Sequence, residues 1–409
     1  MDIDQQVLVY LLSLAIRGKR PQDFVIGEAD WKSIFEQAVS HDVYALMYPA
    51  VKDLSPEYGP DRDLMLKWER AVLFAGMTQI QHMEKLGEVF RCFNDAGIPV
   101  VALKGIVLRE LYPQPELRTM ADVDILVRDE HKKRAKNLLL CMGYVEDDSD
   151  FKHTVLRYAD LVIELHNMLM SHESLKAAEC FEKSIWSSTA PAQINGMPVL
   201  LLSSDDSLLY MFLHLAEHIA SYGFGLRQLC DIVIFIESYK DKLDWDYLYS
   251  HIKAFGIERF VFAVFVTCHK LFGMELPNGL FCREVADHPY LEVFINDILS
   301  GGVHGHTDFS RHIGNSLLRY VNYDGSENSS GKIKYYISFL FPTADRLRKR
   351  YSYARRSPFL IPAAWLHRLL YNICRKNFVS IVRTAFLHPR RSLATFEERT
   401  GLLRWLNLK

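Results

Sequence analysis

The stretch Asp122-Val123-Asp124-Ile125-Leu126-Val127 constrains the fold of this chain most, because charged and apolar residues alternate along its first half. An alternation with a period of two is typical of a β-strand with one apolar face. In such a strand the carboxylates of Asp122 and Asp124 point to the same side, about 6.6 Å apart along the backbone. Two adjacent carboxylates repel each other unless a cation lies between them. The stretch therefore predicts a strand with a cation site on one face.

A second segment of the same kind, Val162-Ile163-Glu164-Leu165-His166, places a third carboxylate among apolar residues. An isolated buried glutamate is costly, so Glu164 is expected to share a cation with the two aspartates. Oxygen ligands on rigid strands suit Mg²⁺ or Mn²⁺, which takes one or two carboxylates and fills its other positions with water and substrate phosphate. Asp122, Asp124 and Glu164 are thus the candidate catalytic residues and metal ligands. Three acids could hold two ions that activate an attacking oxygen and stabilise the leaving phosphate oxygens.

Upstream, Val100–Leu103 reads as a strand that leads into a helix beginning near Ile106. Gly105 at this junction allows close approach of the backbone, and the first amides of a helix form an anion site suited to a triphosphate. Lys104 adds a point charge and Arg118 a planar fork, and both suit phosphate.

These three residues, Lys104, Gly105 and Arg118, are candidate phosphate- or nucleotide-binding residues, and His166 joins them as a group that touches substrate. Simpler interpretations stay open. Lys104 and Arg118 fit ordinary surface charges, and His166 fits a residue that only orients Glu164 or caps the strand. Glu164 itself has a candidate partner in Arg157.

Hydrophobic periodicity divides the chain into helical and β-rich parts. Before residue 90, apolar residues three and four apart predict helices over Val7–Ile16, Trp31–Tyr48 and Leu64–Phe90. From about Pro99, strands are expected at Pro99–Leu103, Asp122–Val127, Thr154–Tyr158 and Asp160–His166, with helices at Ile106–Leu111 and Glu130–Met142. After Ser171 the pattern returns to helix, at Leu208–Ala220, Leu226–Tyr239 and Asp246–Phe272. Ala159-Asp160 is a candidate tight turn, and Ser203 with Asp206 a candidate capping box.

In this order, the residues resemble the polymerase-β-like nucleotidyltransferase superfamily, which pairs a glycine-containing turn at a helix start with a D-x-D strand and a third acid on a later strand. Over residues 99–170 the chain resembles, more narrowly, the bacterial family of uncharacterised nucleotidyltransferases. The elements that carry this resemblance are Leu103-Lys104-Gly105, Leu111-Tyr112-Pro113, Arg118, Asp122–Val127, Gly143-Tyr144 and Ile163-Glu164-Leu165-His166. A looser resemblance takes in histidine-containing helices at 41 and 208–237. Two features depart from the superfamily: Ile106 follows Gly105 where a serine or glycine is usual, and the loop Tyr112–Arg118 is inserted.

The resemblance implies an α+β fold, with a small mixed-sheet nucleotidyltransferase core at about residues 90–200 flanked by helical N- and C-terminal regions. We expect an N-terminal helical region at 1–90, the catalytic core at 91–200, a helical domain at 201–300, a loop or linker at 301–335 and a basic amphipathic helical tail at 336–409. The resemblance also implies a metal-dependent enzyme that moves a nucleoside monophosphate from an NTP such as ATP to a hydroxyl-bearing acceptor and releases pyrophosphate. A small molecule, a protein side chain and a tRNA end all stay open as acceptors.

Composition places the chain among soluble, globular proteins, with 49% hydrophobic and 24% charged residues over 409 positions. The longest apolar runs, Val7–Ile16 and Phe260–Cys268, are shorter than the roughly 20 residues of a membrane-spanning helix. Acidic residues precede the first run and basic residues follow it, the reverse of a secretory signal, so we expect a cytoplasmic protein. Seven scattered cysteines without a C-x-x-C pair indicate neither a disulfide framework nor a cysteine zinc site.

One competing motif is His214-Leu215-Ala216-Glu217-His218, which matches the H-x-x-E-H pattern of inverted zinc proteases. On a helix the two histidines share a face and could bind Zn²⁺, with Glu217 as general base and an acid such as Glu292 as third ligand. The same helix is explained without zinc if the histidines pack against Arg227 and Asp231 on the next helix. The zinc metalloprotease is therefore a remote alternative.

The C-terminal tail carries a strong positive charge, with 15 Lys and Arg against 3 Asp and Glu from residue 343 to the end. Arginines and lysines there alternate with apolar residues such as Trp365, Leu366 and Ile373, as in a basic amphipathic helix. Such a tail could dock on the acidic remainder of the chain, bind nucleic acid, or contact an anionic membrane surface peripherally. A catalytically silent scaffold that binds RNA or membrane through this tail is thus the main alternative to an enzyme.

Overall fold

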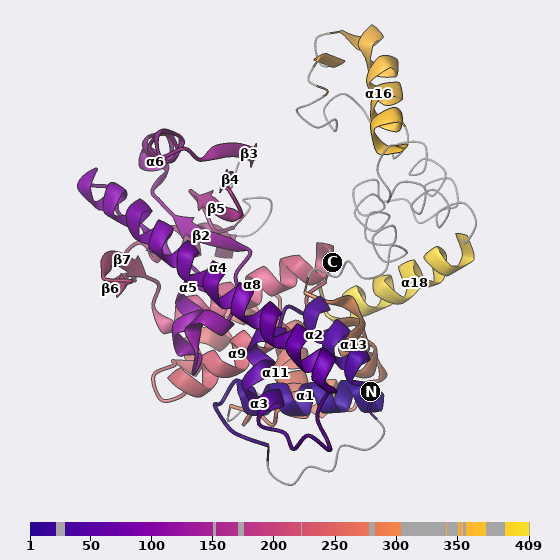
Figure 1. Cartoon of the computed structure of the whole chain (residues 1–409). Helices are drawn as coiled ribbons and strands as arrows, with labels where there is room; N and C mark the ends of the chain where they lie inside the picture. Colours follow the sequence, from indigo (N-terminus) through magenta and orange to yellow (C-terminus); the bar gives the residue numbers. More distant parts are fainter. Residues whose placement is uncertain are drawn as a thin grey trace.

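The computed structural model describes residues 1–21, 29–149, 153–170, 176–221, 223–277, 283–303, 341, 351, 353–354, 357–373 and 389–408. The larger helices are α1 (Ile3–Ala15), α2 (Trp31–Ser40), α3 (Tyr44–Lys52), α4 (Arg62–Asp95), α6 (Asp129–Cys141), α7 (Lys176–Ile185), α8 (Ser204–Ser221), α9 (Leu226–Tyr239), α10 (Trp245–Ala254), α11 (Glu258–Phe272), α13 (Pro289–Gly301), α16 (Ile361–Ile373) and α18 (Pro389–Trp405) (Figure 1). Short helical turns are α5 (Gly105–Leu108), η1 (Arg109–Leu111), η2 (Pro115–Leu117), α12 (Arg283–Ala286) and η5 (Pro358–Leu360).

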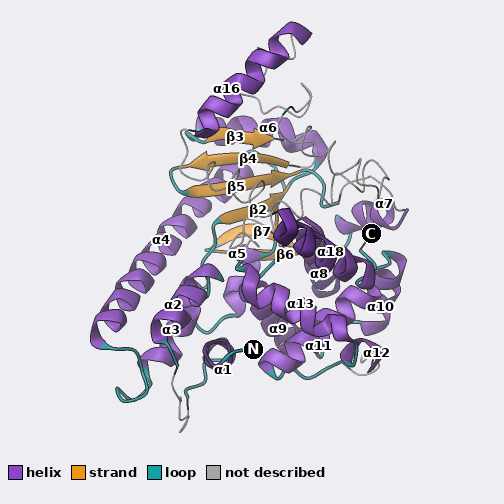
Figure 2. Ribbon diagram, turned by 90° about the vertical axis from the view of Figure 1, so that its right-hand side faces the viewer, coloured by secondary structure: helices purple, strands orange, loops and turns teal. Residues whose placement is uncertain are grey.

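Seven strands form one mixed sheet in the order β3-β4-β5-β2-β1-β7-β6. Their bounds are β1 (Val101–Ala102), β2 (Asp122–Leu126), β3 (Val145–Ser149), β4 (His153–Tyr158), β5 (Leu161–His166), β6 (Ala190–Ile194) and β7 (Met197–Leu201). At its centre β2 runs parallel to β5 and antiparallel to β1, and β1 runs parallel to β7. The α+β expectation of a mixed sheet flanked by helices is confirmed (Figure 2).

The two faces of β2 pack against different parts of the molecule. Val123, Ile125 and Val127 are at most 1% exposed and join a core cluster with the second half of α4 and with α6. Leu126, on the opposite face, joins the larger core cluster of the helical body, which includes α1, α3, α8, α9 and α11. The carboxylates of Asp122 and Asp124 share this second face, so the sheet presents them toward the helical body.

Most of the helices and strands expected from periodicity are confirmed, with three breaks that the pattern does not predict. The helix expected over residues 31–48 divides at Asp42, whose φ is 53°, and the one over 246–272 divides at Gly256, whose φ is 68°. A positive φ cannot continue a right-handed helix. The helix expected over 106–111 is one α-helical turn followed by a 3₁₀ turn. The turn at Ala159-Asp160 is confirmed, and Ser203 accepts a hydrogen bond from the backbone of Asp206 as expected of a cap.

The periodicity did not predict β3, and it did not predict β6 and β7 because the pattern after residue 171 indicates helix. The hairpin β6–β7 extends the sheet beside β1, and β3 pairs with β4 at the other edge. Asn195-Gly196, both with positive φ, joins β6 to β7 in a two-residue turn. Asn-Gly is the strongest short signal for such a hairpin. Pro191 and Pro198 within the strands obscure it, since proline favours edge strands or none.

The end of the chain returns to the helical body. Leu402, Leu403 and Leu406 are buried in its core cluster, and Arg399 forms a 2.5 Å ion pair with Asp297 of α13. The last segment of the tail, at residues 399–406, therefore packs on the helical body. Most of the expected linker and the basic residues between 346 and 356 lie outside the described residues. None of the described helices combines the length and the apolar character needed to cross a membrane.

Candidate active site

Strand pairing brings two of the three predicted acids together. On the parallel strands β2 and β5, Asp124 and Glu164 are direct register partners, and Asp122 stands two residues earlier on the same face. Asp124 is 7% exposed, Glu164 is half-buried and Asp122 is exposed at the first position of its strand. The apolar residues between the acids hold β2 in place by packing on the opposite face, so the carboxylates have a rigid base.

His166 lies against both carboxylates of this pair. Its Nε2 donates a hydrogen bond to Oδ1 of Asp124 at 2.8 Å and lies 3.4 Å from Oε2 of Glu164. Within the described ranges, Asp124, Glu164 and His166 form the group of three whose ligand atoms all lie within 4.8 Å of one another, the spacing of a metal site. Asp122 lies outside this group of three, and the buried Nδ1 of His166 has no hydrogen-bond partner in the part of the chain that the structure describes.

Lys104 reaches the same carboxylates from the turn between β1 and α5. Its Nζ lies 3.1 Å from Oδ1 of Asp124, 3.2 Å from each ring nitrogen of His214 and 5.3 Å from the centre of the Tyr210 ring. Its backbone has φ 42° and ψ −116°, a strained conformation for a residue with a side chain. Strain of this kind clusters at functional sites, where the surrounding structure maintains it.

The negative charge of the site is only partly balanced. Burial raises the pKa of Asp124, but Lys104 and His166 outweigh burial and hold that pKa well below its usual range. For the exposed Asp122 the balance is opposite: partial desolvation and repulsion by Asp124 and Glu164 raise its pKa. The pKa of His166 rises because its bonds to the two carboxylates outweigh burial. Lys104 and His166 therefore stabilise the charge of Asp124, and the excess negative charge of the site lies on Asp122.

These residues fit a hard divalent cation. They offer several carboxylate oxygens on adjacent strands, the donor type that Mg²⁺ and Mn²⁺ prefer. The raised pKa of Asp122 marks negative charge that a bound cation would relieve. The assignment of Asp122, Asp124 and Glu164 as metal ligands stays a prediction, as does the phosphate-binding role of Lys104.

Arg118 lies in a buried cluster beside Gly105. All three of its guanidinium nitrogens donate hydrogen bonds, two to the carboxylate of Asp231 and one to the carbonyl of Thr119. Tyr112 donates to the same carboxylate at 2.8 Å. A Cβ added to Gly105 would lie 3.0 Å from Nη1 of Arg118, so the glycine lets the turn pack against the guanidinium. Phosphate binding by Arg118 stays a prediction, and the structure gives it a positioning role for the turn.

The H-x-x-E-H helix faces the same site, and its histidines and Glu217 are not part of a group of three close metal-ligand atoms among the described residues. His214 and His218 contact each other at 2.7 Å, and His214 contacts Lys104. The expected third ligand, Glu292, pairs with Lys270 on the helical body. Arg227 and Asp231, against which the zinc-free interpretation packs the histidines, form ion pairs with Asp42 and Arg118.

Burial and the positive charges of Lys104 and His218 lower the pKa of His214, so it stays a neutral partner of the lysine. His214 and Tyr210 are thus residues of the site that the sequence did not assign to it. The H-x-x-E-H pattern marked the helix, but only the tertiary structure shows which lysine it contacts.

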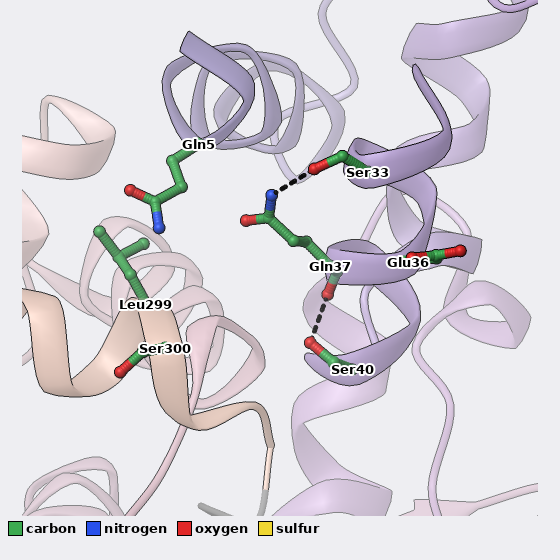
Figure 3. Close-up of a pocket in the computed structure, with 7 residues that line it drawn as sticks. All are labelled: Gln5, Ser33, Glu36, Gln37, Ser40, Leu299 and Ser300. Carbon is green, nitrogen blue, oxygen red and sulfur yellow. Dashed lines mark hydrogen bonds between the residues drawn. The ribbon is translucent and has the colours of Figure 1, made fainter. Parts of the chain in front are cut away.

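A polar hollow of about 340 Å³ lies elsewhere, among α1, α2 and α13 (Figure 3). Gln5, Ser33, Gln37 and Ser40 line it with amide and hydroxyl groups, and Gln37 donates to Ser33 within it. It contains none of the residues that the sequence predicts for catalysis.

The sequence model of one family, described as uncharacterised nucleotidyltransferase, matches residues 27–273. That range runs from before α2 to just after α11 and so includes the site and the helices around it. No curated protein matches the chain.

Two solved structures show similarity. The antibiotic-resistance factor ANT(2'')-Ia is 14% identical, with a TM-score of 0.33 over 44% of this chain and 91% of its own. An antigenic nucleotidyltransferase-like protein from Paracoccidioides brasiliensis is 16% identical, with a TM-score of 0.29 over 51% of this chain and 97% of its own.

Proposed function

The chain belongs to the uncharacterised nucleotidyltransferase family, and we propose that it moves a nucleoside monophosphate from an NTP to a hydroxyl-bearing acceptor with release of pyrophosphate. The observation that carries this proposal is the register of β2 and β5, which sets Asp124 beside Glu164 with Asp122 on the same face. Rigid carboxylates in this arrangement are what metal-dependent attack on a phosphate requires.

In this proposal Asp122, Asp124 and Glu164 hold Mg²⁺ or Mn²⁺. When bound, such an ion lowers the pKa of the attacking hydroxyl and neutralises the leaving pyrophosphate. Lys104 sits at the entrance of the turn that contains Gly105 and supplies a fixed positive charge for the β and γ phosphates. His166 acts as a positioning residue, because its hydrogen bond keeps one oxygen of Asp124 in a fixed direction.

Thermal unfolding of the wild type with each of the four NTPs, with and without Mg²⁺, tests the proposal. Binding to the native state adds about 2.7 kcal/mol of stability when the ligand is at 100 times its Kd, which is readily measured. We expect one NTP to stabilise the protein only with Mg²⁺, and the Asp122→Asn/Asp124→Asn variant to lose that effect. Pyrophosphate release in the presence of candidate acceptors then identifies the acceptor class.

Glu292→Gln is the matched control, since it removes a carboxylate of the helical body that pairs with Lys270. It should keep the full response to nucleotide and Mg²⁺. A wild type that responds to no NTP would favour the scaffold that acts through its basic tail. Zinc in the purified protein that is lost in Glu292→Gln would instead favour the metalloprotease.

A further inference from the structure

The long helix α4 carries a stripe of apolar side chains that the described residues leave exposed. Leu66, Leu73, Phe74, Met77 and Ile80 are 42%, 61%, 74%, 62% and 52% exposed. They lie within a 15-residue stretch of one helix, whereas isolated exposed apolar residues need no explanation. In both views α4 lies along the outside of the molecule, and in Figure 2 it forms its left edge.

The spacing of the stripe is that of a helix that pairs with another helix. Leu66, Leu73 and Ile80 recur every seven residues, and Met77 follows Leu73 by four. A seven-residue repeat divided into steps of three and four keeps apolar side chains on one face over several turns. The buried side of α4 uses different residues, such as Trp68, Val72 and Phe90, to pack against the molecule. The stripe is therefore a second, separate packing face.

Two charged residues on the same face as the stripe, one within it and one just beyond Ile80, indicate the partner. Arg70 and Glu84 are exposed, each lies seven residues from Met77, and neither forms an ion pair with a described residue. If two copies of α4 pair antiparallel about a two-fold axis at Met77, Arg70 of each copy meets Glu84 of the other. The same axis sets Phe74 opposite Ile80, so the centre of the stripe meets apolar side chains and the two charges meet their opposites, whereas Leu66 meets Glu88 at the edge.

We propose that the protein forms a symmetric dimer through antiparallel pairing of α4, with Met77 on the two-fold axis. The interface covers the centre of the apolar stripe, from Leu73 to Ile80, and adds two ion pairs between Arg70 and Glu84. The opposite face of the same helix holds the loop before the active-site strand, because Gln79 exchanges two 3.1 Å hydrogen bonds with the backbone of Met120. Dimer formation would thus immobilise a helix that positions Asp122.

Charge reversal in the full-length chain tests the pairing. By sedimentation velocity from roughly 1 to 100 μM, we expect a dimer for the wild type and at least a tenfold weaker dimer for Arg70→Glu or Glu84→Arg alone. The double variant Arg70→Glu/Glu84→Arg restores both ion pairs in reverse and should recover the dimer. These residues are exposed, so the fold should tolerate the changes; circular dichroism checks this.

Cysteine cross-linking fixes the axis. Under mild oxidation Met77→Cys should form a disulfide-linked dimer, because the two copies of residue 77 meet. Leu66→Cys should not, since its two copies lie about 33 Å apart along the paired helices. The wild type, with its own cysteines, gives the background. A wild type that is monomeric throughout this range, or a double variant that fails to recover the dimer, would overturn the proposal and leave the stripe to a different partner.

Discussion

Two ion pairs lie near the turn at Gly105, one between Arg118 and Asp231 and one between Lys104 and Asp124. They differ in how completely their charges are balanced. Arg118 and Asp231 are 2.6 Å apart, their side chains are 7% and 6% exposed, and Tyr112 completes the carboxylate. Lys104 and Asp124 are 3.1 Å apart and similarly buried, but Glu164 and Asp122 bring further negative charge to the same place.

We call the arginine pair closed, because its charges balance each other, and the lysine pair open, because negative charge is left over beside it. The arginine pair has matched charges and filled hydrogen bonds, and the backbone of Arg118 is relaxed at φ −81°. The lysine pair has a strained backbone at φ 42° and a neighbouring aspartate whose pKa is raised. The negative charge left over at the open pair can attract a cationic ligand, whereas the charges of the closed pair already balance each other.

The largest effect is expected from opening the closed pair. Arg118→Met leaves the carboxylate of Asp231 buried and without a cation, which should lower the free energy of unfolding by about 3–5 kcal/mol in urea denaturation. The double variant Arg118→Met/Asp231→Leu removes both charges and should recover most of that loss. Lys104→Met should cost less than Arg118→Met, because Asp124 keeps its 2.8 Å bond from His166. Equal losses in the two single variants would remove the distinction between the pairs.

A smaller effect on stability should come from the strained backbone of Lys104 in the open pair. Lys104→Gly and Lys104→Ala both remove the ammonium, but only glycine relaxes the positive φ. Strain of this kind costs about 1–3 kcal/mol, and the extra freedom of glycine in the unfolded chain offsets part of it. Lys104→Gly should therefore be more stable than Lys104→Ala by about 1 kcal/mol in urea denaturation. The same exchange at Arg118, where φ is negative, should favour alanine, and a similar gain for glycine there would rule out strain as the cause.

The sequence predicts the surroundings of the open pair better than those of the closed pair. The alternation around Asp122 and Asp124 and the strand around Glu164 were sufficient to place three acids on one sheet face, because a strand's side chains follow its backbone with a period of two. Phosphate binding by Arg118 stays a prediction, but the sequence does not show that Asp231, more than a hundred residues later, meets its guanidinium. The sequence did not predict the hairpin β6–β7 for a local reason: its prolines weaken the strand pattern around a clear Asn195-Gly196 turn.

The smallest effect concerns the unbalanced charge itself. The folded-state pKa of Asp122 is raised, so the folded protein binds this proton more tightly than the unfolded chain does. The contribution of this group to stability is present below its ordinary pKa of about 3.9 and is lost as the pH rises through the raised value. At neutral pH the charge of Asp122 therefore destabilises the metal-free protein, although its exposure to solvent keeps the effect small.

Asp122→Asn should consequently raise the melting temperature in EDTA at pH 7 by a small but measurable amount, and the gain should shrink as the pH falls toward 4. In Mg²⁺ the order should reverse, because the wild type gains stability from the ion and the variant loses a ligand. Glu292→Gln, which removes an exposed carboxylate paired with Lys270, should show neither behaviour. If Asp122→Asn destabilises the protein in EDTA, the aspartate has a structural partner, and the excess charge that distinguishes this pair from the closed one lies elsewhere.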